Sequence, residues 1–97
     1  MEKEFIRRKL DFKGCRYAVN FFDRIIEALE LGVGRCGRNW SAIIDFAWSE
    51  SIVEKLLIKN TNDLTDELKT ALPTFYKVLD TIKKDSHGFF SYEVKDD

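Results

Sequence analysis

The stretch "NWSAIIDFAWSESIVEKLLIKN", residues 39–60, places an amphipathic segment directly before a continuously apolar one. The first part repeats apolar residues at positions i, i+3, i+4, i+7 and i+8, which are Trp40, Ile43, Ile44, Ala47 and Trp48. This spacing predicts a helix that begins after the cap residue Asn39 and buries that stripe, both tryptophans included. Because each helical residue turns by about 100°, Ser41, Asp45 and Ser49 then form an adjacent polar edge, each one turn from the next.

Three segments read as strands. Residues 54–60, "EKLLIKN", carry three apolar residues in a row, which is typical of a central parallel strand covered on both faces. Residues 5–12, "FIRRKLDF", alternate with period two and predict the first strand. The closing "FFSYEV" predicts a third strand, in which Phe90, Tyr92 and Val94 alternate.

A further helix lies between the first strand and residue 39. We expect Asn20 to cap it, with Asp23 as the acidic half of a capping box. Its predicted buried stripe is Phe22, Ile25, Ile26 and Leu29. Gly32 is expected to end it in a left-handed turn.

Two more helices are predicted after the middle strand. "TNDLTDEL" indicates a turn and a short helix capped by Asn62 or Asp63. Pro73 suits the first turn of the next helix, and Gly88 is expected to stop it. The buried stripe of that helix is predicted to be Phe75, Val78, Leu79 and Ile82.

The predicted order is therefore β-α-α-β-α-α-β. Strands joined through helices are expected to pair in parallel, so the fold class is α/β, a small three-stranded parallel sheet packed with helices. The chain of 97 residues fits one domain, residues 1–97, and no linker divides it.

Composition narrows the function. Sixteen basic and seventeen acidic residues leave a net charge of -1, so neither direct nucleic-acid binding nor an anionic membrane is expected. No apolar run approaches a bilayer span and the N-terminus is charged, so we expect a cytoplasmic protein. We also expect a monomer. With two cysteines and one histidine, a zinc site lacks ligands. Free thiols at Cys15 and Cys36 are favoured, and a disulfide between them stays open.

The glycines Gly32, Gly34 and Gly37 have the spacing G-x-G-x-x-G of dinucleotide-binding turns. That turn must follow a strand, whereas these glycines follow a predicted helix, and no acidic residue ends the segment some twenty residues on. No cofactor is therefore expected. The loop instead presents Arg35, Cys36 and Arg38 directly before a helix, as an exposed recognition loop would.

"CGRNWSAIIDFAW", residues 36–48, resembles the segment that identifies the barstar family of intracellular ribonuclease inhibitors. The predicted order of elements agrees with that family over most of the chain. The resemblance implies a protein that is not an enzyme and that occludes an enzyme's active site with the loop and helix of residues 33–49. An aspartate on that helix then takes the place of a substrate phosphate.

By position in the motif, Asp45 matches the phosphate-mimicking aspartate, Asn39 the asparagine beside the loop, and Gly37 the loop glycine. The sequence also departs from the family: Ser41 stands at its other helix aspartate, and Arg35-Cys36 replaces its aromatic pair. The acidic contribution of the last helix is matched at best by Asp85. The predicted partner-binding residues are therefore Asp45, Asn39, Ser41, Arg35, Gly37, Arg38 and Asp85. The expected partner is a nuclease or toxin other than barnase, the family's best-known target.

Two other function classes stay open. The same face suits an adaptor or regulatory module, in which Arg35 and Arg38 seek carboxylates of a non-nuclease partner. An enzyme would need Cys36, Asp45 or His87 as actors, but the sequence offers no nucleophile-base pair.

Overall fold

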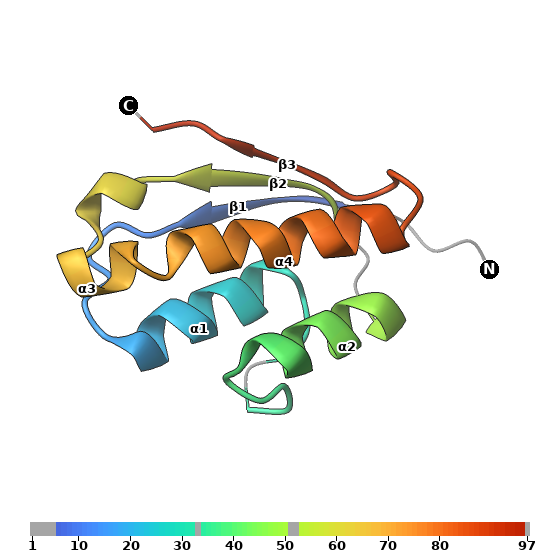
Figure 1. Ribbon diagram of the computed structural model, residues 1–97, viewed down its shortest axis with the longest axis horizontal. Coiled ribbons are helices and arrows are strands. Elements are labelled where there is room, and N and C mark those ends of the chain that lie inside the picture. Colours follow the sequence, from blue (N-terminus) through green and yellow to red (C-terminus); the bar gives the residue numbers. More distant parts are fainter. Residues whose placement is uncertain (1–5, 33, 51–52, 97) are drawn as a thin grey trace.

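The computed structural model describes residues 6–32, 34–50 and 53–96, with the side chains of Ser49 and Glu50 outside that description. Its elements are, in chain order, β1 (Ile6–Asp11), α1 (Ala18–Ala28), α2 (Trp40–Glu50), β2 (Val53–Lys59), the 3-10 turn η1 (Thr61–Asp63), α3 (Asp66–Lys69), α4 (Leu72–Asp85) and β3 (Ser91–Val94). The predicted α/β order is confirmed (Figure 1).

The three strands form one parallel sheet in the order β1-β2-β3. Leu10 pairs with Ile58, and Ile58 with Val94, across the sheet. The pairing of β1 with β2 shifts after Ile6, where Glu54 is the extra residue on β2. β2 lies between β1 and β3, so a neighbouring strand covers each of its edges. Its apolar composition suits this central position.

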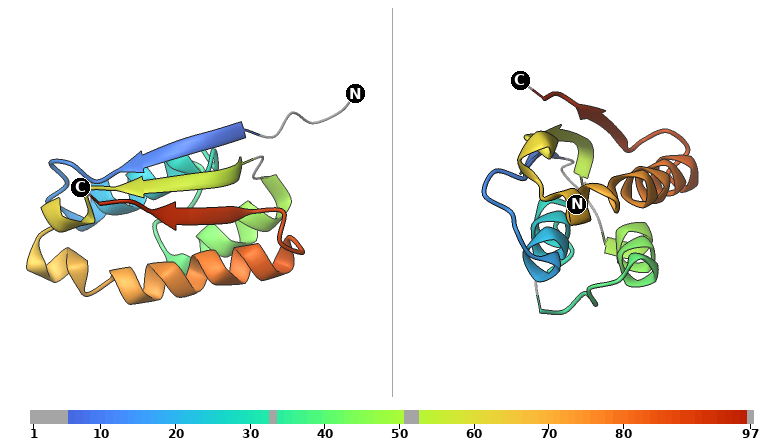
Figure 2. Two further views of the ribbon diagram at one scale, coloured as in Figure 1. Left: turned by 90° about the horizontal axis from the view of Figure 1, so that it is seen from above. Right: turned by 60° about the vertical axis from the view of Figure 1, so that its left-hand side comes forward.

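The long helices α1, α2 and α4 all lie on one side of the sheet (Figures 1 and 2). The expectation that the middle strand is covered on both faces is therefore wrong. Leu56 and Ile58 face the helices and are fully buried, whereas Leu57 points to the open side and is half-buried. Long basic side chains beside Leu57 shield that face, because their aliphatic stems cover apolar surface while their charges stay in water.

An aromatic cluster joins the helices to the sheet. Phe75 of α4 stacks on Trp40 of α2 with ring centroids 5.9 Å apart, and its edge meets Phe12 and Phe21, each at 6.2 Å. Phe12 and Phe21 stack at 5.2 Å. The predicted stripe of α4 is buried throughout, and Pro73 lies in its first turn as expected.

The helix ends differ from the sequence prediction. Tyr17, not Asn20, precedes α1, and no side chain caps that end. Glu30, with φ 59°, reverses the chain after α1 while the amide of Leu31 donates to the carbonyl of Ile26 at 3.0 Å. That pair of features is a Schellman C-cap, and it lies two residues before Gly32, so Gly32 does not end the helix.

The same C-cap recurs after α4. His87 has φ 56°, and the amide of Gly88 donates to the carbonyl of Lys83 at 2.9 Å. The residue that ends α4 is thus His87, one position before the expected glycine. Farther upstream, Thr65 caps α3 by accepting from the amide of Leu68 at 3.2 Å, in place of Asn62 or Asp63.

Replacing His87 with Gly is expected to stabilise the protein by about 0.5–1 kcal/mol, because a left-handed backbone costs less without a Cβ. Urea unfolding at neutral pH measures the change. Lys84→Gly, three residues earlier in the exposed last turn of α4, should lower stability by about 1 kcal/mol. Equal effects of the two variants would contradict the role assigned to His87.

Candidate protein-binding surface

The loop between α1 and α2 is a tight turn held by its own backbone. The amides of Arg35 and Cys36 both donate to the carbonyl of Gly32, at 3.0 and 3.1 Å. A Cβ on Gly32 would lie 3.3 Å from Cδ of Arg35, so the stem of that arginine lies over the glycine. Val33, within the predicted site segment, lies outside the described residues.

Cys36 does not belong to the recognition surface. Its side chain is buried and joins the core, which contradicts the expectation that it is exposed beside the arginines. Cysteine behaves as a small apolar side chain when buried, and here it anchors the centre of the loop. Cys15 is also buried, and both are free thiols. Burial raises the pKa of the Cys15 thiol.

Arg38 ties the loop to α1. Its guanidinium donates to both carboxylate oxygens of Asp23, at 2.8 and 3.2 Å. These hydrogen bonds raise the pKa of Arg38. Asp23 therefore serves as the partner of a loop arginine rather than as half of a capping box. Arg38 is exposed, but part of its charge is compensated within the chain.

Asn39 caps α2 as predicted. Its side-chain oxygen accepts from the amide of Ala42 at 2.8 Å, and its own amide donates to the carbonyl of Gly37 at 2.9 Å. A Cβ on Gly37 would lie 3.0 Å from Nδ2 of Asn39 and 3.3 Å from Cβ of Ala42. Glycine at 37 is thus what lets the loop approach the capped helix end closely.

Asn39→Ala should destabilise the protein by about 1 kcal/mol, because the first turn of α2 loses the acceptor of a backbone amide. Asn39→Asp keeps an acceptor oxygen and is expected to retain most of the stability. Thermal unfolding followed by circular dichroism compares the two. A full loss in both variants would show that the amide group, rather than the cap, matters.

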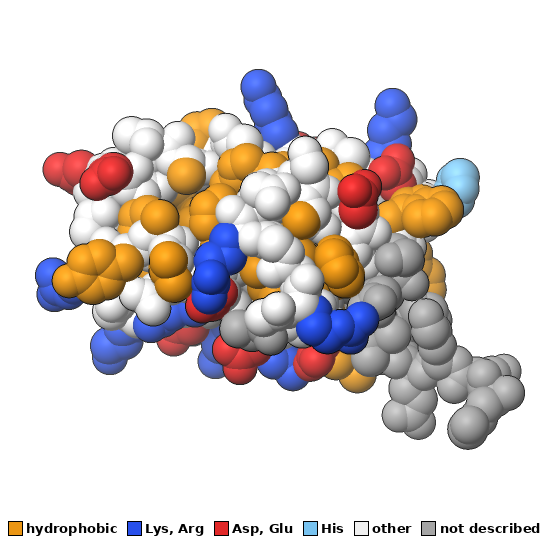
Figure 3. Space-filling model, turned by 90° about the horizontal axis from the view of Figure 1, so that it is seen from below, with side chains coloured by type: hydrophobic (Ala, Val, Ile, Leu, Met, Phe, Trp, Pro, Cys, Tyr) orange, Lys and Arg blue, Asp and Glu red, His pale blue; other side chains and the backbone are white. Residues whose placement is uncertain are grey.

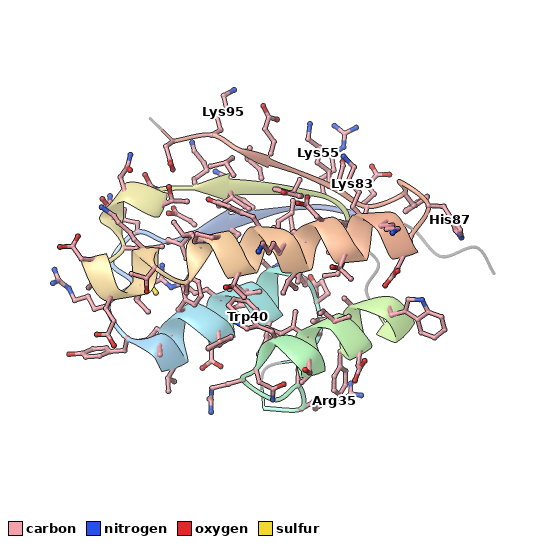
Figure 4. The ribbon with its side chains drawn as sticks, viewed as in Figure 1. Arg35, Trp40, Lys55, Lys83, His87 and Lys95 are labelled. Atoms are coloured by element: carbon pink, nitrogen blue, oxygen red, sulfur yellow. The ribbon has the colours of Figure 1, made fainter. Side chains whose placement is uncertain are left out.

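The outer side of α2 carries Ser41, Asp45 and Trp48, at positions i, i+4 and i+7, and all three are exposed. Trp40 at the start of the helix packs inward between α1 and α4, as expected (Figure 4). Trp48 does not: its side chain is 74% exposed, so the prediction that it lies in the core is wrong. The last turn of α2 forms the rim of a groove instead of lying beneath another element.

This groove, of about 210 Å³, runs between the ends of α2 and α4. Its floor is apolar, with Ile44, Ala47 and Ile82, and its rim carries Trp48, Asp85 and Phe89. Phe89 is 48% exposed. Figure 3, which looks at the helical face, shows hydrophobic and acidic side chains together beside the single histidine, His87.

The groove brings Asp85 to the C-terminal end of α2, the helix that carries Asp45. Periodicity did not reveal this surface, because it assigned Trp48 to the core stripe and Phe89 to no site. The one available signal was the aromatic pair Phe89-Phe90, of which only one member can face inward in an alternating strand.

All seven predicted partner-binding residues are exposed. Asn39, Gly37, Arg35 and Arg38 belong to the loop and the start of α2, Ser41 and Asp45 to its outer side, and Asp85 to the groove. Among the described residues, no three His, Cys, Asp or Glu side chains are grouped so as to hold a metal ion. The glycine loop follows α1 rather than a strand, which removes the geometry of a dinucleotide turn.

Comparison with known proteins identifies no relative. No family model matches the chain, and neither the curated proteins nor the solved structures contain a significant match. Separately, the described helices include none with the length and apolar character needed to cross a bilayer.

Proposed function

We propose that this protein is a cytoplasmic, barstar-like inhibitor that blocks the active site of a ribonuclease or related toxin, as an immunity protein does. The observation that carries the proposal is the exposed carboxylate of Asp45 on a helix whose start is fixed by the Asn39 cap. A carboxylate on a rigid helix loses little freedom on binding, and it pairs well with the Arg and Lys groups that hold a substrate phosphate.

The apolar groove at the C-terminal end of α2, the helix that carries Asp45, supports the same use. Trp48 and Phe89 expose aromatic surface next to the acidic Asp85. Tightly binding interfaces commonly combine an aromatic anchor with charged groups that become desolvated around it. In this proposal Trp48 provides the anchor, and Asp45 and Asp85 meet basic groups of the enzyme.

The motif of residues 36–48 and the order of elements favour the inhibitor over the two other function classes. The pairing of Arg38 with Asp23 also reduces the positive charge that the loop arginines would direct at a basic enzyme. An adaptor for a non-nuclease partner would use the same face through Arg35. An enzyme gains little support, because Cys36 is buried and His87 forms the end of α4.

The test is titration of the purified protein against small ribonucleases, with cleavage of a fluorogenic RNA as the readout. The nuclease or toxin encoded by a neighbouring reading frame, where one exists, is the first enzyme to assay. We expect stoichiometric loss of cleavage for the cognate enzyme. Stable binding to a protein without nuclease activity, and full activity of every ribonuclease tested, would favour the adaptor.

A further inference from the structure

The open face of the sheet carries a basic hollow on the side opposite the helices. This hollow, of about 370 Å³, is lined by Arg7, Arg8 and Lys9 from β1, Lys55 and Leu57 from β2, and Glu93 and Lys95 from the β3 end of the sheet. Figure 4 shows Lys55 and Lys95 extending away from the helices. The view from above in Figure 2 faces the same side.

The charges of the chain are divided unevenly between its faces. Among the described residues, five basic side chains line this hollow but only one acidic side chain, that of Glu93, does. The rest of the chain is consequently net acidic, although the whole has a net charge of -1. The expectation that the protein does not contact nucleic acid rested on that whole-chain balance, which averages over two different surfaces.

Among the described residues, Lys9 and Lys95 form no close ion pair with a carboxylate, and both are exposed. The charge of Lys9 acts only at longer range on Asp11, where it helps to lower the pKa of that carboxyl group. Arg7 lies 3.4 Å from Glu54, Lys55 lies 3.5 Å from Glu93, and Arg8 pairs with Glu30. Exposed pairs of this kind are weak, so a phosphate can replace the carboxylate at Arg7 or Lys55.

The strands place these cations at a regular spacing. Arg7 pairs with Lys55 across β1 and β2, and Lys9 lies two residues farther along β1. The amide of Lys95 donates to the carbonyl of Ile58 at 2.8 Å, which holds Lys95 beside β2 past the end of β3. Neighbouring strands are about 4.8 Å apart and alternate residues about 6.7 Å apart, so the cations cover a surface wide enough for an extended phosphate chain.

We propose that this sheet face binds the phosphodiester backbone of nucleic acid without reading its sequence. A polyphosphate is favoured over an acidic protein because, among the described residues that line the hollow, half-buried Leu57 is the only one without a charged side chain, whereas protein interfaces have a more apolar centre. No aromatic side chain lines the hollow, so bases have no stacking platform there. Contacts to phosphate alone position a nucleic acid but do not specify its sequence.

The test is fluorescence anisotropy of the full chain with labelled single-stranded RNA of about 16 nucleotides and with a duplex of equal length. With about three phosphates neutralised, affinity should fall roughly 20- to 40-fold between about 50 and 200 mM salt for either form, with a dissociation constant in the micromolar range or weaker. The nucleic acid with the lower dissociation constant, single-stranded or duplex, is the form that this surface prefers.

A double variant, Lys9→Gln with Lys95→Gln, should lower the affinity about a hundredfold at 50 mM salt and flatten the salt dependence. The matched control is Lys77→Gln with Lys84→Gln, which removes two exposed lysines from α4 on the other side of the molecule. Circular dichroism confirms that both variants are folded.

Three results would overturn the proposal: no binding at 50 mM salt, equal losses in the two double variants, or binding to polyglutamate or anionic vesicles but not to nucleic acid. Each leaves the proposed inhibitor function intact, because that function uses α2, α4 and the loop. Conversely, a variant of the inhibitor surface that no longer inhibits the enzyme but still binds RNA would show that the two surfaces act independently.

Discussion

Replacing Asp45 with Ala is expected to weaken the complex with the cognate enzyme by about 2–5 kcal/mol, which is roughly 30- to 5,000-fold in Kd. The loss should be this large because the enzyme's cationic groups stay buried without their partner once the carboxylate is gone. Asp45→Asn keeps the shape and removes the charge, so it should lose most of the same affinity. Titration calorimetry of each variant with the inhibited ribonuclease measures the change.

The control for Asp45 is an exposed aspartate at the other end of the molecule. Asp63 is exposed in η1, after the C-terminal end of β2, and its backbone amide donates to the carbonyl of Asn60 at 3.1 Å. Asp63→Ala should leave the Kd within about a factor of two, as is usual for surface changes outside an interface. If Asp45→Ala binds as tightly as the parent protein, Asp45 does not mimic a phosphate and the proposed function loses its central residue.

Phe75→Ala should cause the largest loss of stability, about 3–5 kcal/mol. Phe75 is fully buried and contacts Phe12, Phe21 and Trp40, which come from three other parts of the chain. The cavity left by the ring therefore separates α1, α2 and the sheet at the same point. A domain of this size has about 5–15 kcal/mol of stability in total, so the variant is expected to be close to unfolding.

The matched control for Phe75 is a second phenylalanine with little burial. Phe89 is 48% exposed at the rim of the groove, and Phe89→Ala should change stability by less than about 1 kcal/mol. Thermal unfolding should place the melting temperature of Phe75→Ala at least about 12 °C below that of the parent protein. Similar melting temperatures for the two variants would show that the aromatic cluster does not hold the helices on the sheet.

Phe89→Ala also separates stability from binding. If Trp48 and Phe89 provide the apolar part of the enzyme interface, this variant should keep its fold but bind the enzyme more weakly than the parent protein does. The comparison thus distinguishes a phenylalanine that stabilises the core, Phe75, from one on the surface that is proposed to bind the partner, Phe89.

Local sequence signals identified part of the candidate site. The Asn39 cap follows from side-chain chemistry within three residues, and helical periodicity placed Ser41 and Asp45 on an exposed edge. Periodicity was wrong for Trp48, because an apolar residue on a buried stripe emerges where the neighbouring element ends. The exposure expected of Cys36 was also wrong; it was inferred from the position of Cys36 in a loop, but the burial of a loop residue depends on which distant residues close over it.

Contacts between distant residues supplied the rest of the site. The ion pair of Arg38 with Asp23 joins the loop to α1, fifteen residues away in the sequence. The groove needs the ends of α2 and α4 to lie together, which places Asp85 near Trp48. Neither the ion pair nor the groove produces a periodic pattern of residues, so neither can be recognised from a short segment of the sequence.

The amino-acid sequence by itself determined the order of helices and strands, the buried stripe of α4, most of the stripe of α1, and the parallel arrangement of three strands. On α1 the predicted Phe22 is only half-buried, and its neighbour Phe21 is the buried phenylalanine. These properties depend on the period of apolar residues and on short-range turn chemistry, both of which act over a few neighbouring positions. Only the tertiary structure decided that every long helix packs on one face of the sheet, and hence that Arg7, Lys9, Lys55 and Lys95 share the other. The period of a strand separates its two sides, but the packing of helices determines which side is covered and which remains open to water.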